Sequence, residues 1–205
     1  GLGKSVPRSQ LAPHQSGQDH LAICLHNGNE YLECMLGAFK ARVVPFNVNY
    51  RYVAEELAYL LRDADARGIV YHSAFAPVLG EVLDAVPGTG VRWQVPDDSG
   101  IGLLEGSRWY DDALAGQPTV LAEGTAESWS PDDLYLLYTG GTTGMPKGVM
   151  WRQADIFVAA LGGRRLDNDR EWDSLDQIVA NTRVGGARLL PAAPLMHGAA
   201  HWLAF

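Results

Sequence analysis

The sequence predicts an α/β fold whose core consists of parallel βαβ units. Three observations support this fold class. Short apolar runs of strand length alternate with longer segments in which apolar residues recur every three or four positions. Turn-forming residues separate the two kinds of segment, and a loop rich in Gly and Thr directly follows a late apolar run. Strands and helices that alternate at this spacing indicate parallel strands joined by right-handed helical crossovers.

The first half of the chain carries strands and helices in strict alternation. Residues 20–25 form an apolar run that ends at the turn sequence HNGNE, which indicates a buried strand. Residues 30–41 have apolar side chains on most sides of a helical pattern, so a buried helix is expected there. Residues 43–48 indicate the next strand, although Pro45 within it cannot donate a backbone hydrogen bond. The other expected elements are a helix at 53–61, a strand at 69–71, a helix at 76–86 and a strand at 91–95.

The second half has a weaker pattern that strengthens again at a buried strand. Residues 96–132 are rich in Gly, Asp, Ser and Pro and are expected to connect two parts of the fold, with one helical piece at 109–114. Residues 134–138 indicate the buried strand. Later elements are expected at 149–151 (strand), 156–161 and 175–179 (helical) and 188–196 (extended). The chain therefore divides into a polar lead-in at 1–19, a βαβ subdomain at 20–95, a connecting region at 96–132 and a phosphate-loop region at 133–205.

The composition excludes several classes of function. The 205 residues carry a net charge of −8 without any run of Lys or Arg, which argues against nucleic acid as a partner. No stretch reaches the roughly 18 apolar residues of a membrane span, and the polar start has no apolar targeting core. Cys24 and Cys34 form no CxxC pair, so buried free thiols are expected, with a disulfide or metal pair as the less favoured alternative. These features predict a cytoplasmic protein.

The loop TGGTTGMPKG at 139–148 combines the residue types that hold phosphate. Glycines reach unusual backbone angles and let N–H groups approach an anion, threonine hydroxyls add donors and can bind Mg²⁺, and Lys147 supplies a positive charge. A Walker A loop is excluded because Pro146 precedes the lysine and Gly148 follows it, and GxGxxG is absent. The alternative is a Gly/Thr-rich surface turn. The coincidence of strand, glycines, threonines and lysine favours a phosphate-binding loop.

Three stretches resemble one known family. The first is LLYTGGTTGMPKGV at 136–149, which resembles the phosphate-binding loop of the adenylate-forming (AMP-binding) superfamily: acyl-CoA synthetases, peptide-synthetase adenylation domains and luciferases. Residues 31–67 resemble the family's early helix, strand and helix, with a Pro-Xaa-Asn turn. PLMHGAAHW at 194–202 resembles a later segment in which a histidine follows Pro, an apolar pair and an aromatic residue or Met. The resemblance implies the large amino-terminal domain of such an enzyme, with the phosphate loop following a strand.

Within the family, the chain is most similar to actinobacterial fatty-acyl and steroid-side-chain CoA ligases. The residues that carry this likeness are HNGNEYLE at 26–33, PFNVNYRY at 45–52 and KGVMWRQ at 147–153. Many relatives have His and Thr where this chain has Trp151 and Arg152, which argues against a peptide synthetase or a luciferase.

The resemblance implies an acid–thiol ligase that uses ATP, Mg²⁺ and CoA. A carboxylate attacks the α-phosphorus of ATP to give an acyl-adenylate and pyrophosphate, and the CoA thiol then displaces AMP. The acid is expected to be a fatty or steroid-side-chain acid. Adenylation of an aryl or amino acid, and a non-catalytic nucleotide-binding remnant, stay open as alternatives.

The resemblance also assigns site residues. Those that line the triphosphate are Thr139, Gly140, Gly141, Thr142, Thr143, Gly144 and Lys147. Thr139 is the expected Mg²⁺ contact, and Lys147 and His197 are the expected catalytic residues. His197 is expected near the acyl carboxylate and α-phosphate, and His201 and Trp202 beside the acyl group. For all three, ordinary packing in the core is the alternative.

The resemblance covers the chain from about residue 20 and indicates an amino-terminal fragment. The sequence lacks the family's Tyr-Gly-Xaa-Thr-Glu stretch, ribose-binding Asp, hinge and mobile carboxy-terminal domain. The 205-residue chain alone is therefore expected to be inactive, and the remainder of its own chain is an expected partner. The sequence leaves a homo-oligomer open.

Overall fold

A seven-stranded, mostly parallel sheet organises the chain in the computed structural model, which describes residues 2–3, 5–140, 144–165, 167–181, 190 and 192–204. The strands are β1 (His20–Cys24), β2 (Val44–Asn47), β3 (Ala66–His72), β4 (Val91–Val95), β5 (Arg108–Trp109), β6 (Leu134–Thr139) and β7 (Lys147–Arg152). Their order in the sheet is β5-β4-β3-β1-β2-β6-β7. All neighbours are parallel except β6 and β7, which are antiparallel.

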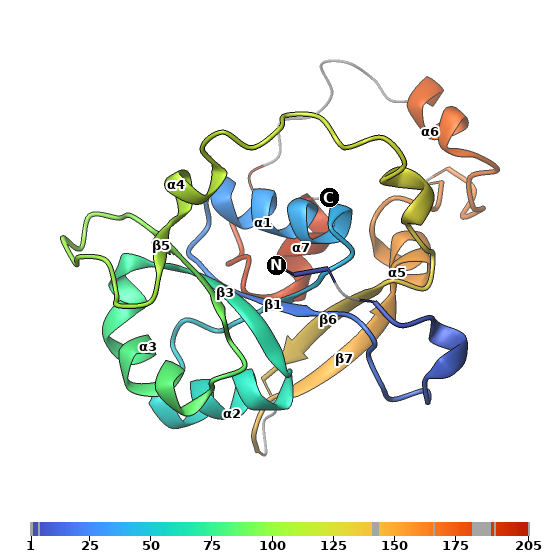
Figure 1. Cartoon of the computed structure of the whole chain (residues 1–205). Coiled ribbons are helices and arrows are strands. Elements are labelled where there is room, and N and C mark those ends of the chain that lie inside the picture. Colours follow the sequence, from blue (N-terminus) through green and yellow to red (C-terminus); the bar gives the residue numbers. More distant parts are fainter. Residues whose placement is uncertain are drawn as a thin grey trace.

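Helices lie on both faces of the sheet (Figure 1). They are α1 (Asn29–Lys40), α2 (Ala54–Asp63), α3 (Ala76–Val82), α4 (Tyr110–Leu114), α5 (Gln153–Ala160), α6 (Leu175–Asn181) and α7 (Gly198–Ala204). Short 3₁₀ turns are η1 (Arg8–Gln10), η2 (Ser73–Phe75), η3 (Leu83–Ala85) and η4 (Ala126–Ser128). Helices α2 and α3 pack on one face, and α1, α5 and α7 on the other. The fold is therefore a three-layer α/β/α arrangement.

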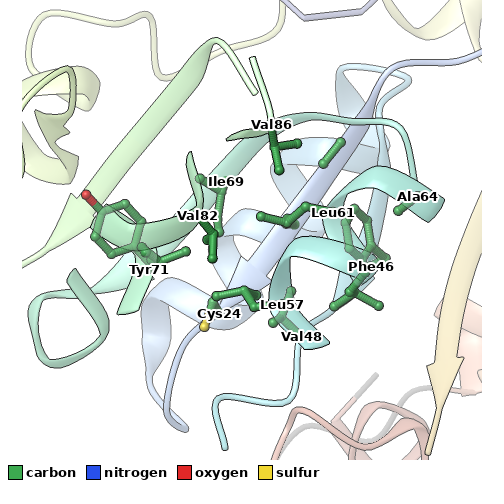
Figure 2. Close-up of a cluster of buried hydrophobic side chains, with 14 of the residues drawn as sticks. Cys24, Phe46, Val48, Leu57, Leu61, Ala64, Ile69, Tyr71, Val82 and Val86 are labelled. Atoms are coloured by element: carbon green, nitrogen blue, oxygen red, sulfur yellow. The ribbon is translucent and has the colours of Figure 1, made fainter. Parts of the chain in front are cut away.

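Strands β1, β3 and β6 are mostly apolar because each contributes buried side chains to two cores. In β1, Ala22 and Cys24 face α2 and α3, whereas Leu21 and Ile23 face α1. This alternation follows from the two-residue period of a strand, and burial on both faces removes the polar positions of a half-exposed strand. Figure 2 shows the α2/α3 core, where Leu57 and Leu61 gather with sheet residues such as Phe46 and Ile69.

The expected fold class is confirmed, and most expected elements in residues 20–95 are present within a few positions. Three details differ from the expectation. Helix α1 buries only the face with Tyr31 and Cys34, and Leu36 is exposed, so it is not buried on most sides. Residues 45–47 continue strand β2 rather than forming a turn. The helix expected at 76–86 is α3 followed by the tighter turn η3.

The later part of the chain departs further from expectation. The strand expected at 149–151 is present as β7, and it pairs antiparallel with β6, a β-hairpin that the sequence did not indicate. Strand β5 and helix α7 were not expected. Of the extended segment expected at 188–196, residues 188, 189 and 191 lie outside the described residues. One sheet joins strands from 20–95, from the connecting region and from 133–205, and the division into these parts stays a prediction.

Both cysteines are free and buried, as expected. Cys24 belongs to the core on one face of the sheet and Cys34 to the core on the other, so the sheet separates them. Burial raises the pKa of each thiol to about 12, which keeps both protonated and unreactive. Among the described helices, none combines the length and the apolar character needed to cross a membrane.

One ion pair ties the end of α1 to the start of β6. The Arg42 guanidinium donates to both carboxylate oxygens of Asp133, over 2.9 Å from Nε to Oδ2 and 2.7 Å from Nη2 to Oδ1. Asp133 is only 4 % exposed. Arg42 also has a left-handed backbone, with φ 56°, directly after the C-cap Ala41. A position that usually suits glycine therefore carries arginine, whose side chain joins segments 91 residues apart.

Replacing Arg42 with Ala is expected to lower the free energy of unfolding by about 1.5–3 kcal/mol, because two charge-assisted hydrogen bonds to a buried carboxylate are lost. Arg42→Gly should cost about 1 kcal/mol less than Arg42→Ala, since glycine adopts the left-handed backbone without strain. Urea unfolding followed by tryptophan fluorescence measures both. The control is Arg67→Ala, which breaks an exposed pair with Asp65 and should cost less than about 1 kcal/mol. Equal losses for Arg42→Ala and Arg67→Ala would contradict the assignment.

Candidate functional site

The carboxyl ends of the parallel strands meet at one edge of the sheet, where α/β proteins commonly bind ligands. Strands β1, β2, β3 and β6 share their direction, so the residues that end or follow them lie along this edge (Figure 1). Asn27 follows β1, and Asn47, His72 and Thr139 end β2, β3 and β6. The expected phosphate loop begins here, because β6 ends at Thr139.

The β6–β7 hairpin brings together two of the expected phosphate-binding residues. Thr139 pairs directly with Lys147 in the antiparallel register, so the loop between the strands is residues 140–146. Side chains of such a pair lie on the same face, with Cβ atoms about 4.5–5.5 Å apart. Both residues are exposed, and Lys147 makes no ion pair with any described residue. A hydroxyl and an ammonium group therefore stand side by side at the base of the loop.

The described glycines of the motif have two different roles. A Cβ added to Gly140 or Gly144 would meet no atom within 4 Å, and neither residue has a positive φ. A Cβ on Gly148 would lie 2.9 Å from Leu136 Cδ1 and 3.0 Å from the Tyr138 ring. A side chain at position 148 would clash with the Tyr138 ring, so packing requires glycine there. At Gly140 and Gly144, neither the backbone conformation nor packing requires glycine.

Gly141, Thr142 and Thr143, the remaining expected phosphate ligands, lie outside the described residues. Among the described residues there is also no group of three His, Cys, Asp or Glu side chains able to hold a metal ion. Mg²⁺ in nucleotide sites binds phosphate oxygens, several waters and only one or two protein oxygens. The exposed Thr139 hydroxyl fits one such position, so the donor set suits a nucleotide-bound Mg²⁺ and not a metal held by protein alone.

Asn47 connects the end of β6 to the segment that precedes His197. Its Oδ1 accepts the backbone N–H of Tyr138 at 2.8 Å. Its Nδ2 donates to the carbonyl oxygen of Tyr138 at 3.0 Å and to that of Met196 at 2.6 Å. Asn47 is buried, and its amide nitrogen and its amide oxygen both form hydrogen bonds. The residue before Thr139 and the residue before His197 are therefore bonded to the same side chain.

A second asparagine, Asn27, forms hydrogen bonds to the same segment. Asn27 accepts the backbone N–H of Leu195 at 2.7 Å and donates to the carbonyl oxygen of Ala193 at 3.1 Å. The backbone N–H of His197 donates to Pro194 at 3.0 Å, which closes a turn. The backbone from 193 to 197 is thus fixed while the His197 side chain is exposed.

Helix α7 begins directly after His197 and lies against β6. A Cβ added to its first residue, Gly198, would lie 2.5 Å from Cδ2 of Leu137, a buried residue of β6. Glycine at this position permits the close approach of helix and strand. His197 therefore directly precedes the point at which α7 packs on the carboxyl-terminal half of β6.

His201, on α7, lies in the core rather than at the surface. It is 1 % exposed, its Nδ1 is 2.5 Å from the Tyr135 hydroxyl and its Nε2 is 2.5 Å from the Leu195 carbonyl oxygen. Because a carbonyl only accepts, Nε2 carries the proton and Nδ1 accepts from Tyr135. Burial lowers the pKa of His201 to about 4, so the ring is neutral at pH 7. Trp202, its neighbour in sequence, is 43 % exposed, so the two residues expected beside the acyl group point into different environments.

Sequence reasoning did not single out Asn27 and Asn47. Each is an asparagine at or just after the carboxyl end of a strand expected to be apolar. A polar side chain at that position of a parallel sheet lies on the ligand-binding edge, and this placement is the signal that could have identified them. The backbone groups that they bind, in residues 138 and 193–196, follow from no sequence pattern.

The chain matches the family model described as AMP-binding enzyme over residues 14–205. It is 51 % identical, over 98 % of its length, to the medium-chain acyl-CoA ligase Mig of Mycobacterium avium, and covers 36 % of that protein. It is 35 % identical, over 91 % of its length, to the 3-oxocholest-4-en-26-oate–CoA ligase of Rhodococcus rhodochrous, and covers 34 % of that protein. The chain therefore spans about a third of the length of these curated relatives.

Solved structures share the fold. The inhibitor-bound N-terminal domain of FACL13 from Mycobacterium tuberculosis superposes with a TM-score of 0.60 at 24 % identity, over 98 % of this chain and 41 % of that one. A long-chain-fatty-acid-CoA ligase (FadD1) from Archaeoglobus fulgidus gives a TM-score of 0.59 at 22 % identity, over 90 % of this chain and 32 % of that one. At these identities the likeness establishes the fold alone.

The buried His201 predicts a loss of stability in mild acid. Its folded-state pKa, about 4, lies below the ordinary value of 6.5, so the unfolded chain takes up the proton first as the pH falls. The stabilising contribution is complete above about pH 6.5 and is lost between pH 6.5 and 4, by about 3 kcal/mol in total. Urea unfolding at pH 7.5, 5.5 and 4.5 measures the slope.

The matched variant is His201→Gln, which cannot titrate. It should be less stable than the wild type at pH 7.5 but should lose less stability on acidification. Burial also lowers the pKa of His20 and His72, so part of the slope will persist in the variant. Identical slopes in the two proteins would show that His201 is not a buried neutral group.

Proposed function

The chain belongs to the AMP-binding enzyme family, and from this premise we propose that it carries the ATP-phosphate-binding site of an acid–thiol ligase. The complete enzyme activates a carboxylic acid with ATP to an acyl-adenylate, with release of pyrophosphate, and then transfers the acyl group to CoA, with release of AMP. The observation that carries the proposal is the pairing of Thr139 with Lys147 at the base of the Gly/Thr loop, on the carboxyl edge of the sheet.

The acid in this proposal is a fatty acid or a steroid-side-chain acid. The support is the 51 % identity to a ligase named for medium-chain acids and the 35 % identity to one named for 3-oxocholest-4-en-26-oate. Both names describe apolar acids, which need an apolar pocket around the chain and polar groups only at the carboxylate.

The hairpin residues act by position and charge. Two anions, the carboxylate and the triphosphate, must be brought together, and negative charge must be stabilised as pyrophosphate leaves. The Lys147 ammonium faces the phosphates, and the Thr139 hydroxyl donates a hydrogen bond or binds the metal. Bound Mg²⁺ neutralises phosphate charge. Gly140 and Gly144 leave the backbone N–H groups open to a phosphate oxygen, which agrees with the open space around both.

We assign His197 to the carboxylate end of the acid. Its side chain is exposed, beside β6, and its backbone is fixed by the turn at 193–197. For the acyl chain we propose Trp202 as the contact, since it is partly exposed on α7, and His201 as its buried neighbour. Gly141, Thr142 and Thr143 complete the phosphate loop in this proposal. A cytoplasmic location belongs to it as well, because the sequence has only two cysteines and so lacks the cysteine density of disulfide-dependent secreted domains.

Exchange of radiolabelled pyrophosphate into ATP tests the proposal on the full-length protein. The substrates compared are a medium-chain fatty acid, a long-chain fatty acid, a 3-oxo steroid with a carboxylated side chain, an aryl acid and an amino acid. Exchange that depends on a fatty or steroid acid, followed by thioester formation with CoA, is the expected result. Exchange with only the aryl or amino acid would identify a different acid class. ATP binding without exchange for any acid would identify a nucleotide-binding remnant.

Replacing Lys147 with Ala should slow adenylation about ten- to a hundredfold. The change removes a charge-assisted hydrogen bond worth about 1.5–3 kcal/mol, at about 1.4 kcal/mol per factor of ten. The melting temperature should stay the same, since the side chain is exposed and pairs with no described residue. Lys147→Arg should restore little activity, because the planar guanidinium does not reproduce a compact charge.

Arg152 offers a matched control. It is an exposed cation at the far end of the same strand, where it pairs with Asp132 and Asp155. Arg152→Ala should leave the rate of pyrophosphate exchange unchanged. If Lys147→Ala also exchanges at the wild-type rate, Lys147 does not bind the phosphates.

A further inference from the structure

We propose that Asn47 is a positioning residue that fixes the phosphate hairpin and His197 relative to each other. The inference rests on the proposed function, because it assigns a consequence for catalysis to the bonds that Asn47 makes. In the sequence, Thr139 and His197 each lie one residue beyond a residue that Asn47 bonds. Asn47 bonds the backbone of Tyr138 and Met196, the residues directly before them in the chain.

The backbone ladder cannot supply this connection. Among the described residues, the parallel register between β2 and β6 joins a single pair, Phe46 and Leu136. Pro45, earlier in β2, has no N–H to donate. The Asn47 side chain accepts from the Tyr138 N–H and donates to the Tyr138 carbonyl, as a backbone partner would. The end of β6, from which the phosphate loop leaves, is therefore held by a side chain.

The second proton on Nδ2 extends the connection to the His197 segment. It meets the carbonyl oxygen of Met196 at 2.6 Å, and Met196 is buried. Without Asn47 this carbonyl loses a partner away from water, which favours movement of the peptide toward another partner. Asn27 and the His201 ring continue to hold Ala193 and Leu195. On this side of Asn47, the movement is therefore expected at Met196 and His197.

A buried side-chain amide does not by itself connect segments of the candidate site, as Gln94 illustrates. Gln94 in β4 is fully buried, and its side chain bonds the Tyr71 hydroxyl, the Ser73 hydroxyl, the Gly102 carbonyl and the Leu104 N–H. None of these groups belongs to the hairpin or to the turn before His197. Gln94 thus has the same chemistry and burial as Asn47 without a connection to the site.

A double-mutant cycle on the full-length protein tests the proposal, with pyrophosphate exchange as the assay. Asn47→Asp keeps the size of the side chain and the acceptor for Tyr138 but has no N–H donors, and Asn47→Ala removes all three bonds. Each is expected to lower kcat about tenfold, with a smaller change in the KM for ATP, because misplacement by an ångström affects the reacting geometry more than binding. His197→Ala is the second arm of the cycle.

Asn47→Asp keeps the acceptor for the Tyr138 N–H, so the end of β6 stays tied and the variant acts mainly through Met196 and His197. Its loss of donors therefore has little left to disturb once His197 is gone. In the His197→Ala background, Asn47→Asp should therefore lower the rate by no more than about twofold, which is the usual error of additivity. The control is Gln94→Ala, which should lower stability and change the rate by the same factor with and without His197.

Three results would overturn the positioning role. The first is an Asn47→Asp effect that multiplies with that of His197→Ala to within about twofold. The second is wild-type kcat in both Asn47 variants. The third is unfolding of both Asn47 variants at the assay temperature while Gln94→Ala stays folded, which would make Asn47 a purely structural residue. Failure of the proposed function is recognised separately, because the unsubstituted protein would then show no acid-dependent exchange.

Discussion

Helices cover both faces of the parallel sheet, and this burial decides where polar chemistry can occur. Side chains on the two faces of the central strands enter one of two apolar cores. Hydroxyls, amides and charges therefore meet solvent mainly at the ends of these strands. At the carboxyl ends the chain places Asn27, Asn47, Thr139 and His197. The hairpin that carries Lys147 grows from the same edge, since β7 returns antiparallel to β6. The candidate site is thus a consequence of the layers beneath it.

Asn47, Gln94 and His201 are buried polar side chains whose hydrogen bonds link distant segments of the chain. A buried amide without partners is costly, so Asn47 and Gln94 are each satisfied by backbone or side-chain groups from several segments. The same holds for His201, which stays neutral between Tyr135 and the Leu195 carbonyl. Asn47 and His201 both form hydrogen bonds to the backbone of the turn before His197. Two buried side chains therefore hold the backbone that leads to an exposed side chain.

The residues of the Gly/Thr motif are continuous in sequence but have different physical roles. Gly148 makes room for the Tyr138 ring, whose hydroxyl donates to Asp63 at 2.6 Å and anchors the strand to α2. Gly140 and Gly144 meet no protein neighbour, so their lack of a side chain leaves access to the backbone. Thr139 and Lys147 are strand residues that face each other across the hairpin. The loop that we propose to bind phosphate therefore stands on a base that is held by packing.

Local features of the sequence determined the α/β fold class, the bounds of the strand at 91–95 and the composition of the Gly/Thr loop, because periodicity and turn chemistry act over a few residues. The tertiary structure alone decided the antiparallel return of β7, which places Thr139 opposite Lys147, and the burial of His201 beside an exposed Trp202. It also decided the role of Asn47, whose partners lie 91 and 149 residues away. Contacts of that range depend on how the helices and strands pack, which no local spacing of residues records.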